Sequence, residues 1–355
     1  MIFEGKTILV IGGTGSLGKV LVRRILTDEL GKPGKVIVMS RDEAKQQAMR
    51  VSYMHRKATT DEVIYNNFRQ LLEFRIGNVR NYADVCSAVK DADIIINAAA
   101  LKQVPLCEYF PEQALQTNCL GPVNIVRAIR ENDYSVDTVV GISTDKACKP
   151  VNVMGMSKAI QERIFVSANV LNLKTRFNCV RYGNVLASRG SVIPLFHEQI
   201  KAGGAVTITD ASMTRFLLSI DQAVDTVFAV ISEGKAGEIY VPIADSATVE
   251  NIAKALIGSR KIETEIIGIR PGEKMHEILV SEEECHHVIK RGDYYVILPM
   301  LPELRNVNRE EPSPLDNEFS SADNILDLEG TIELMAKHDL IGPIAELAEA
   351  EELLR

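Results

Sequence analysis

The sequence lacks paired cysteines and any cluster of metal-ligating side chains. Its six cysteines stand singly, at Cys86, Cys107, Cys119, Cys148, Cys179 and Cys285. None belongs to a CxxC pair, and the adjacent His286 and His287 have no further ligand at metal-binding spacing. We therefore expect no metal site, and scattered single thiols fit a reducing cytoplasm.

Long hydrophobic runs and an excess of basic residues are also missing. No apolar stretch approaches the roughly 18–20 residues of a membrane span, and the residues ahead of Thr7 leave no room for a signal peptide. We expect a cytoplasmic protein with no membrane partner. The formal net charge of −8 disfavours a general nucleic-acid binder. The 355 residues, 46% apolar and 25% charged, suit a large domain and a smaller one.

Short apolar runs rich in β-branched residues recur through the first half of the chain. They lie at Thr7–Ile11, Val36–Met39, Ile94–Ile96, Thr138–Ile142 and Phe177–Val180. Such runs are typical of strands that are buried on both faces of a parallel sheet. Helix-like segments alternate with them, at Leu17–Leu26, Val85–Val89, Gln113–Arg130 and Val153–Val170. The alternation predicts an α/β fold with a Rossmann-type, doubly wound parallel sheet.

The pattern changes after about residue 183, where shorter mixed elements with many Gly and Pro begin. We predict a dinucleotide-binding domain over residues 1–182, completed by segments at about 210–242. A smaller, interleaved substrate domain is expected over 183–209 and 243–311, followed by an acidic helical tail over 312–355. The stretch from about 45 to 72 is predicted to be an exposed helical insert, whose Tyr53 and Tyr65 suit a solvated face better than an oligomer contact.

A glycine loop joins the first predicted strand to the first predicted helix. Gly12, Gly15 and Gly18 have the GxxGxxG spacing. Glycines there permit a tight turn, a close approach of backbone to a pyrophosphate, and a helix N-terminus that faces the phosphates. The loop predicts a nicotinamide dinucleotide site that includes Gly12, Thr14, Gly15, Ser16, Leu17 and Gly18.

The second predicted strand ends at Ser40, Arg41 and Asp42. An acid at this place holds the ribose hydroxyls of NAD, whereas an arginine accommodates the 2′-phosphate of NADP. Ser40 and Arg41 therefore favour NADP, and Asp42 keeps NAD open.

An acid and a base stand side by side after the strand at Thr138–Ile142, in Thr144-Asp145-Lys146. Ligands of open α/β sheets bind beyond the carboxyl ends of the strands. Because charged side chains are costly to bury unless they are paired or used, we predict that these residues are catalytic. Lys158 follows in Met154-Gly-Met-Ser-Lys158.

With these motifs the chain resembles the extended short-chain dehydrogenases/reductases, and more narrowly the UDP-N-acetylglucosamine 4,6-dehydratases of polysaccharide biosynthesis. The matching stretches are GGTGSLG, SRDEAKQ, NAAALKQVP, STDKACKPVN, RYGNVLASRGSVIPLF, TITDASMTRF and RPGEKMHE. The resemblance implies a UDP-N-acetylglucosamine substrate, a tightly bound cofactor that is regenerated, and a homo-oligomer, either a dimer or a hexamer.

The resemblance also implies site residues. Those expected at the substrate are Lys102, Asn184, Arg189, Arg215, Arg270 and Glu273. Those expected at the cofactor, beyond the glycine loop and Ser40-Arg41, are Asn78, Val79, Ala98, Ala99, Ala100, Lys102, Asn118 and Lys158. Arginines suit a diphosphate because they donate forked, charge-assisted hydrogen bonds.

One position departs from the superfamily's Tyr-x-x-x-Lys motif, because Met154 stands where the tyrosine is expected. A thioether cannot take the proton of a sugar hydroxyl. A subset of the similar dehydratases also carries Met there. We therefore predict that Asp145 takes the C4 hydroxyl proton and later gives it to the departing C6 oxygen, while Thr144 orients the C4 oxygen.

Lys146, if it is neutral in a desolvated pocket, would remove the C5 proton, and Lys158 would bind the nicotinamide ribose. Two alternatives remain open: a UDP-sugar 4-epimerase, and a non-catalytic NADP-binding regulator. Retention or inversion at C5 is open as well.

Overall fold

The computed structural model describes residues 1–54, 62–171, 174–186, 192–269, 272–304, 312–338 and 340–341. Two of the predicted site residues, Arg189 and Arg270, lie outside the described residues, as do residues 339 and 342–355 of the predicted tail.

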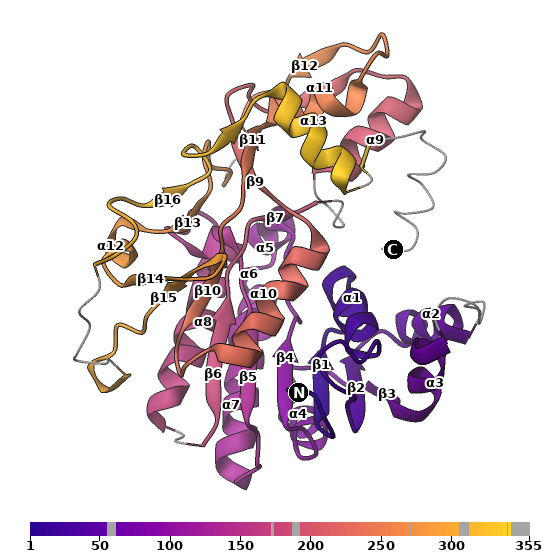
Figure 1. The fold of residues 1–355 in the computed structure, drawn as a ribbon, viewed down its shortest axis with the longest axis vertical. Coiled ribbons are helices and arrows are strands. Elements are labelled where there is room, and N and C mark those ends of the chain that lie inside the picture. Colours follow the sequence, from indigo (N-terminus) through magenta and orange to yellow (C-terminus); the bar gives the residue numbers. More distant parts are fainter. Residues whose placement is uncertain are drawn as a thin grey trace.

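A nine-stranded sheet forms the centre of the molecule, in the order β14-β15-β10-β6-β5-β4-β1-β2-β3 (Figure 1). Every neighbouring pair from β3 to β10 is parallel, and β15 and β14 complete the sheet as antiparallel strands. The strands are β1 Thr7–Ile11, β2 Lys35–Ser40, β3 Leu72–Ile76, β4 Ile94–Asn97, β5 Thr138–Ile142, β6 Arg176–Val180, β10 Ile239–Pro242, β14 Val288–Arg291 and β15 Tyr294–Ile297. The predicted Rossmann-type α/β fold is confirmed.

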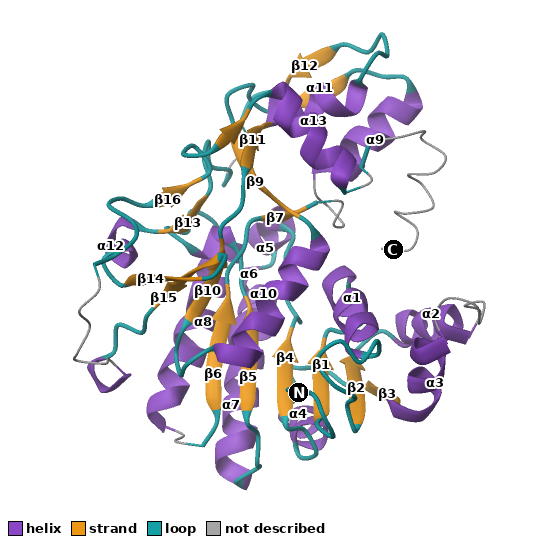
Figure 2. Ribbon diagram, viewed as in Figure 1, coloured by secondary structure: helices purple, strands orange, loops and turns teal. Residues whose placement is uncertain are grey.

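Helices cover both faces of this sheet (Figure 2). Helices α1 (Ser16–Ile25) and α10 (Ile220–Glu233) pack together on one face, and α4 (Tyr82–Val89), α7 (Gly121–Asn132) and α8 (Val153–Leu171) pack on the other. The inner strands are consequently buried on both sides, as their uninterrupted apolar runs predict.

The chain reverses its direction of travel across the sheet at β1. From β1 it moves outward to β2 and β3, and it then returns to β4 on the other side of β1. A reversal of this kind leaves a crevice at the carboxyl ends of the two central strands, where ligands of such folds bind. The glycine loop follows β1 and Ala98–Ala100 follow β4.

The stretch after β2 is not the exposed insert that the sequence predicts. It forms α2 (Glu43–Met54) and α3 (Glu62–Leu71), which lead into the edge strand β3. Tyr53 is buried and stacks on Phe68 with ring centroids 5.2 Å apart, and Met49 and Ile64 are buried beside them. Their apolar faces belong to the main core, so Tyr53 is not a surface residue. Strand β3 escaped prediction because its residues are only partly buried and its sequence, LEFRI, is not apolar throughout.

A smaller part of the molecule stands beyond the carboxyl ends of the strands (Figure 1). It holds a four-stranded sheet of β17 (Ile325–Leu326), β11 (Ser246–Thr248), β9 (Thr214–Leu218) and β7 (Asn184–Val185), and the parallel pair β8 (Val206–Ile208) and β12 (Thr264–Ile266). Helices α9 (Val192–Ala202), α11 (Val249–Ile257) and α13 (Leu328–Lys337) bury their apolar faces in a separate core.

The boundary between the two parts differs from the predicted one in two places. Strand β9 lies within the predicted sheet-completing range but joins the smaller sheet, so only α10 and β10 of that range extend the large sheet. Strands β14 and β15 were assigned to the substrate domain, yet they continue the large sheet. The remaining elements are α5 (Val104–Tyr109), α6 (Pro111–Leu115), a π-helical turn at Gln116–Leu120, 3-10 turns at Asp145–Ala147 and Pro302–Leu304, α12 (Glu282–Cys285), and the antiparallel pair β13 (Ile278–Val280) and β16 (Phe319–Ser320).

Within the described part of the chain, no helix combines the length and the apolar character needed to cross a membrane.

Candidate active site

The glycine loop packs so closely that side chains are excluded from two of its positions. Gly12 has φ +81°, and a Cβ there would lie 2.8 Å from the backbone nitrogen of Ala99. A Cβ on Gly18 would lie 2.5 Å from the Cα of Gly13, so α1 rests directly on the loop. Gly15 is exposed at the start of α1, and no side chain caps this helix. An uncapped helix N-terminus behind bare backbone fits a diphosphate, and Thr14, Ser16 and Leu17 lie in the same turn.

The end of β2 presents positive charge to the crevice. Arg41 is exposed there, and burial together with the charge of Arg41 lowers the pKa of Arg80. Asp42 instead accepts a hydrogen bond from the backbone N–H of Lys45 at 3.0 Å and pairs with the Lys45 ammonium at 3.3 Å. Its carboxylate is therefore occupied at the start of α2. Ser40 accepts a bond from Gln46 at 3.0 Å.

The loop after β4 is held by Asn118, which lies in the π-helical turn before α7. Its side chain accepts from the N–H of Leu101 at 2.8 Å and donates to the carbonyl of Leu101 and to Ser157 Oγ on α8. Asn118 thus ties the loop of Ala98, Ala99, Ala100 and Lys102 to α8. Asn78 and Val79 precede α4, where Asn78 N–H donates to Asp84. Val79 is buried against Gly121.

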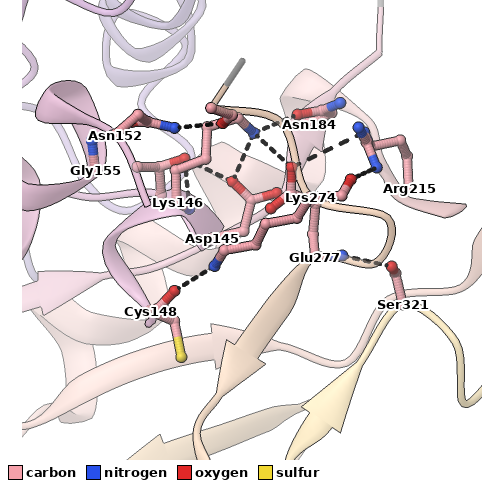
Figure 3. A network of polar contacts seen from close by, with 12 residues as sticks. Asp145, Lys146, Cys148, Asn152, Gly155, Asn184, Arg215, Lys274, Glu277 and Ser321 are labelled. Atoms are coloured by element: carbon pink, nitrogen blue, oxygen red, sulfur yellow. Dashed lines mark hydrogen bonds and ion pairs between the residues drawn. The ribbon is translucent and has the colours of Figure 1, made fainter. Parts of the chain in front are cut away.

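Three of the predicted catalytic residues, Thr144, Asp145 and Lys146, lie in one polar cluster after β5, and Figure 3 shows Asp145 and Lys146 within it. Thr144 Oγ1 donates to Asp145 Oδ1 at 2.8 Å, and Lys146 Nζ lies 3.0 Å from the same oxygen. Lys146 Nζ also donates to Asn184 Oδ1 at 3.2 Å. Asp145 is fully buried, and its Oδ2 has no hydrogen-bond partner among the described residues. One carboxylate oxygen of Asp145 therefore accepts hydrogen bonds, whereas the other is buried without a partner among the described residues.

A residue that the sequence analysis did not single out completes the cluster. Glu277 Oε1 lies 3.4 Å from Lys146 Nζ and 3.9 Å from Arg215 Nε. Glu277 is buried and precedes β13, in the RPGEKMHE stretch of which only Arg270 and Glu273 were expected to bind ligand. An acid immediately before a buried apolar run was the available signal, but spacing alone does not show that it faces Lys146.

The condition that Lys146 be neutral is not met in the site as it stands. Burial alone would lower its pKa, but the charges of Asp145 and Glu277 outweigh burial and the opposing charge of Arg215, so that the pKa is raised. The ammonium form is therefore favoured. The sequence could not show this, because the second carboxylate comes from a distant segment.

Met154 and Lys158 are both buried on α8 but face different surroundings. Met154 packs with Cys107 and Ala114 in a small apolar cluster. Lys158 Nζ donates to the carbonyl of Ile142, at the end of β5, and to Gln161 Oε1 at 2.7 Å. Burial lowers the pKa of Lys158 to about 8. Lys158 thus has neutral and charged forms in balance near physiological pH.

The turn that begins at Gly272 is docked on the large domain. Gly272 has φ +81°, and its carbonyl accepts from Asn152 Nδ2 at 2.9 Å, just before α8. Lys274 donates to the carbonyl of Cys148 at 2.6 Å. Glu273 lies between these two anchors. Arg215 is buried and donates to the carbonyls of Thr214, Lys274 and Met275, so in this state it braces the same turn.

The chain matches a known protein family. The family model described as polysaccharide biosynthesis protein matches residues 8–299. The chain belongs to this family. A relative from Rickettsia bellii, named UDP-glucose 4-epimerase, is 44% identical over 300 residues, which is 83% of each chain.

Two solved structures resemble this chain to different degrees. Pen from Bacillus thuringiensis superposes with a TM-score of 0.85 at 31% identity, covering 96% of this chain and 100% of that one. The dTDP-glucose 4,6-dehydratase DesIV from Streptomyces venezuelae, bound to NAD, has a TM-score of 0.63 at 19% identity over 76% of this chain and 86% of its own. The second likeness shows a shared fold.

Gly12→Ala tests whether close approach, and not only a positive φ, requires the glycine. Gly5 is the matched control, since it has φ +68° and nothing within 4 Å of an added Cβ. Gly5→Ala should lower the free energy of unfolding by about 1–2 kcal/mol, the cost of left-handed backbone. Gly12→Ala should add roughly 1–3 kcal/mol for the clash with Ala99. Urea denaturation measures both, and equal losses would contradict the close packing.

Proposed function

We propose that this protein is a UDP-N-acetylglucosamine 4,6-dehydratase that uses a nicotinamide cofactor, NADP in preference to NAD. The observation that carries the proposal is the acid–base pair of the buried Asp145 and the partly buried Lys146 at the carboxyl end of β5, with Met154 in place of a tyrosine. Loss of water across C5 and C6 needs an acid for the leaving oxygen and a base for the carbon proton.

When bound, the nicotinamide would supply the redox chemistry: hydride is taken from C4 and returned to C6, so the cofactor is regenerated. Asp145 takes the C4 hydroxyl proton on Oδ2, the oxygen that has no hydrogen-bond partner among the described residues. It later delivers that proton to the C6 oxygen, which leaves as water. Thr144, next to Asp145, orients the C4 oxygen. Lys146 removes the C5 proton, which the neighbouring 4-ketone makes acidic. Lys158 binds the nicotinamide ribose and adds positive potential.

The substrate lies between the large sheet and the smaller part. Asn184 already contacts Lys146, and Arg215 lies 3.9 Å from Glu277, so both can exchange internal partners for the nucleotide sugar. Lys102 stands on the exposed loop after β4 and Glu273 in the docked turn. Together with Arg189 and Arg270, these residues supply charge for a diphosphate and an acceptor for ribose hydroxyls.

A UDP-sugar 4-epimerase is the second candidate, because relatives at 44% identity carry the name UDP-glucose 4-epimerase. An epimerase only oxidises and reduces C4, and it has no use for an acid and a base at C5 and C6. The Asp145–Lys146 pair favours the dehydratase over the epimerase and over a non-catalytic regulator.

Incubation of the purified protein with UDP-N-acetylglucosamine in D2O should give a 6-deoxy-4-keto sugar with deuterium at C5. The C5 proton exchanges because elimination passes through C5 deprotonation. NMR of the product reads the result, and its C5 configuration distinguishes retention from inversion. Formation of UDP-N-acetylgalactosamine, or of UDP-galactose from UDP-glucose in a parallel sample, without C5 deuterium would identify an epimerase. Asp145→Asn should lower kcat by roughly 10²–10⁴-fold, the usual contribution of an acid–base residue.

Heat denaturation should release NADP and not NAD. Arg41 and Arg80 gather positive charge at the end of β2, whereas Asp42 is engaged with Lys45. Chromatography of the released nucleotide measures the ratio. Arg41→Asp should shift the bound nucleotide toward NAD, and a wild-type protein loaded with NAD would refute the preference.

We further propose a homo-oligomer formed through α5, α6, the π-helical turn and α8. These neighbouring elements expose large apolar side chains, namely Leu106, Tyr109, Phe110, Leu115, Leu120, Met156 and Ile160. An exposed apolar surface of this extent is typical of an interface.

Light scattering should give the wild-type mass as a multiple of the 39.2 kDa chain. Ile160→Glu, which buries a charge in the interface, should reduce that mass. Ile266→Glu is the control, because Ile266 is also an exposed isoleucine but lies on β12 of the smaller part. An unchanged mass for Ile160→Glu would place the interface elsewhere.

A further inference from the structure

Lys146 cannot act as a base until it loses its own proton. Its ammonium lies between two buried carboxylates, 3.0 Å from Asp145 Oδ1 and 3.4 Å from Glu277 Oε1, and it also donates to Asn184. Asn184 offers an amide oxygen, which does not accept a proton at neutral pH. Within the described residues, the acceptors in reach are therefore the two carboxylates.

Asp145 is not available for that proton during the proposed dehydration. Once it has taken the C4 hydroxyl proton, it is a neutral acid that must keep this proton for the C6 oxygen. Glu277 has no such task. It is 2% exposed, and its Oε2 is buried without a hydrogen-bond partner among the described residues.

The backbone of Glu277 is fixed on both sides, so its carboxylate is held toward Lys146 (Figure 3). Its N–H donates to Ser321 Oγ at 2.9 Å, and its carbonyl accepts from the N–H of Ser321 at 2.8 Å. Ser321 Oγ in turn lies 2.7 Å from Thr214 Oγ1, next to Arg215. This bracing joins the segment before β13 to β9 and keeps Glu277 opposite the Asp145–Lys146 pair.

Building on the dehydratase function, we propose that Glu277 is the proton acceptor that converts Lys146 into the C5 base. An Nζ–H bond of Lys146 breaks and an O–H bond of Glu277 forms, which leaves an amine and a carboxylic acid. Closing a substrate over the site excludes water and penalises the ion pair relative to this neutral pair.

The amine then takes the C5 proton, and the electron pair of the C5–H bond passes into the enolate of the 4-ketone. When C5 is reprotonated later in the cycle, Lys146 gives up one of its three ammonium protons, the others having come from solvent, and becomes an amine again. Glu277 finally returns its proton to Lys146. Both groups end as they began, and no external acid or base is consumed.

Glu277→Gln tests this role, because it preserves shape and removes the ability to accept the proton. It should lower kcat at least about 100-fold, as expected for a lost acid–base function, with KM within about threefold of wild type. Oxidation at C4 precedes the step that fails, so reduced nicotinamide should accumulate when substrate is added, and C5 deuterium uptake in D2O should be lost. Glu277→Asp should restore part of the turnover.

Glu238→Gln is the matched control. Glu238 is also buried and ion-paired, 2.8 Å from Arg291, but it lies directly before β10, at the amino-terminal ends of the parallel strands and so at the opposite end of the sheet from the site. It should lose stability without accumulating reduced nicotinamide. If Glu277→Gln does not fold, Glu277→Asp replaces it in the test, and the same two quantities are measured: the accumulation of reduced nicotinamide and kcat.

Three results would overturn the role of Glu277. One is a Glu277→Gln enzyme with wild-type turnover. Another is an enzyme that retains kcat while the acidic limb of its pH profile moves to lower pH, because Glu277 would then only hold the proton on Lys146. The third is equal loss of nicotinamide reduction and turnover, as a purely structural residue would show. A wild-type enzyme that makes no 6-deoxy-4-keto sugar would instead refute the dehydratase function itself.

Discussion

The geometry of the site depends on a fully buried guanidinium. All five N–H groups of Arg181, directly after β6, are used: they donate to Glu162 on α8, to Glu284 on α12 and to the carbonyl of Leu279 in β13. Burying such a charge costs several kcal/mol unless the geometry is close to ideal. Two forked carboxylates meet that condition. One side chain thereby fixes the large sheet, the helix that carries Met154 and Lys158, and the strand that follows Glu277.

The acid–base cluster is a consequence of this fixation. The residue after Arg181, Tyr182, accepts the N–H of Asp145 at 3.0 Å, so β6 sets the position of the segment after β5. From the other side, β13 sets the position of Glu277. Asp145 and Glu277 are thus brought to one ammonium from opposite walls. With Arg215 the cluster holds two negative and two positive charges, which is why side chains of this type can be buried together.

The sequence predicts those features that depend on local pattern. Strands β1, β2, β4, β5 and β6 are apolar throughout because helices cover both their faces, and the glycine loop has a spacing that few other structures need. Strand β3 and the strands β14 and β15 lack such uninterrupted burial, so composition did not place them in the sheet. Glu277 and the charge state of Lys146 could not be predicted, because each depends on a contact between segments that only the folded chain brings together.

The methionine at position 154 bears on the role of Glu277, because it changes which group has to hold the C4 hydroxyl proton. A tyrosine at position 154 would take the C4 hydroxyl proton and leave Asp145 free to serve Lys146. Met154 packs in an apolar cluster and can take no proton, so in the proposed mechanism that task falls to Oδ2 of Asp145, which has no partner among the described residues. Asp145 would then carry a proton that it must keep until the C6 oxygen departs. The proposed dehydration therefore requires a second buried carboxylate beside Lys146, and Glu277 is the one that the fold places there.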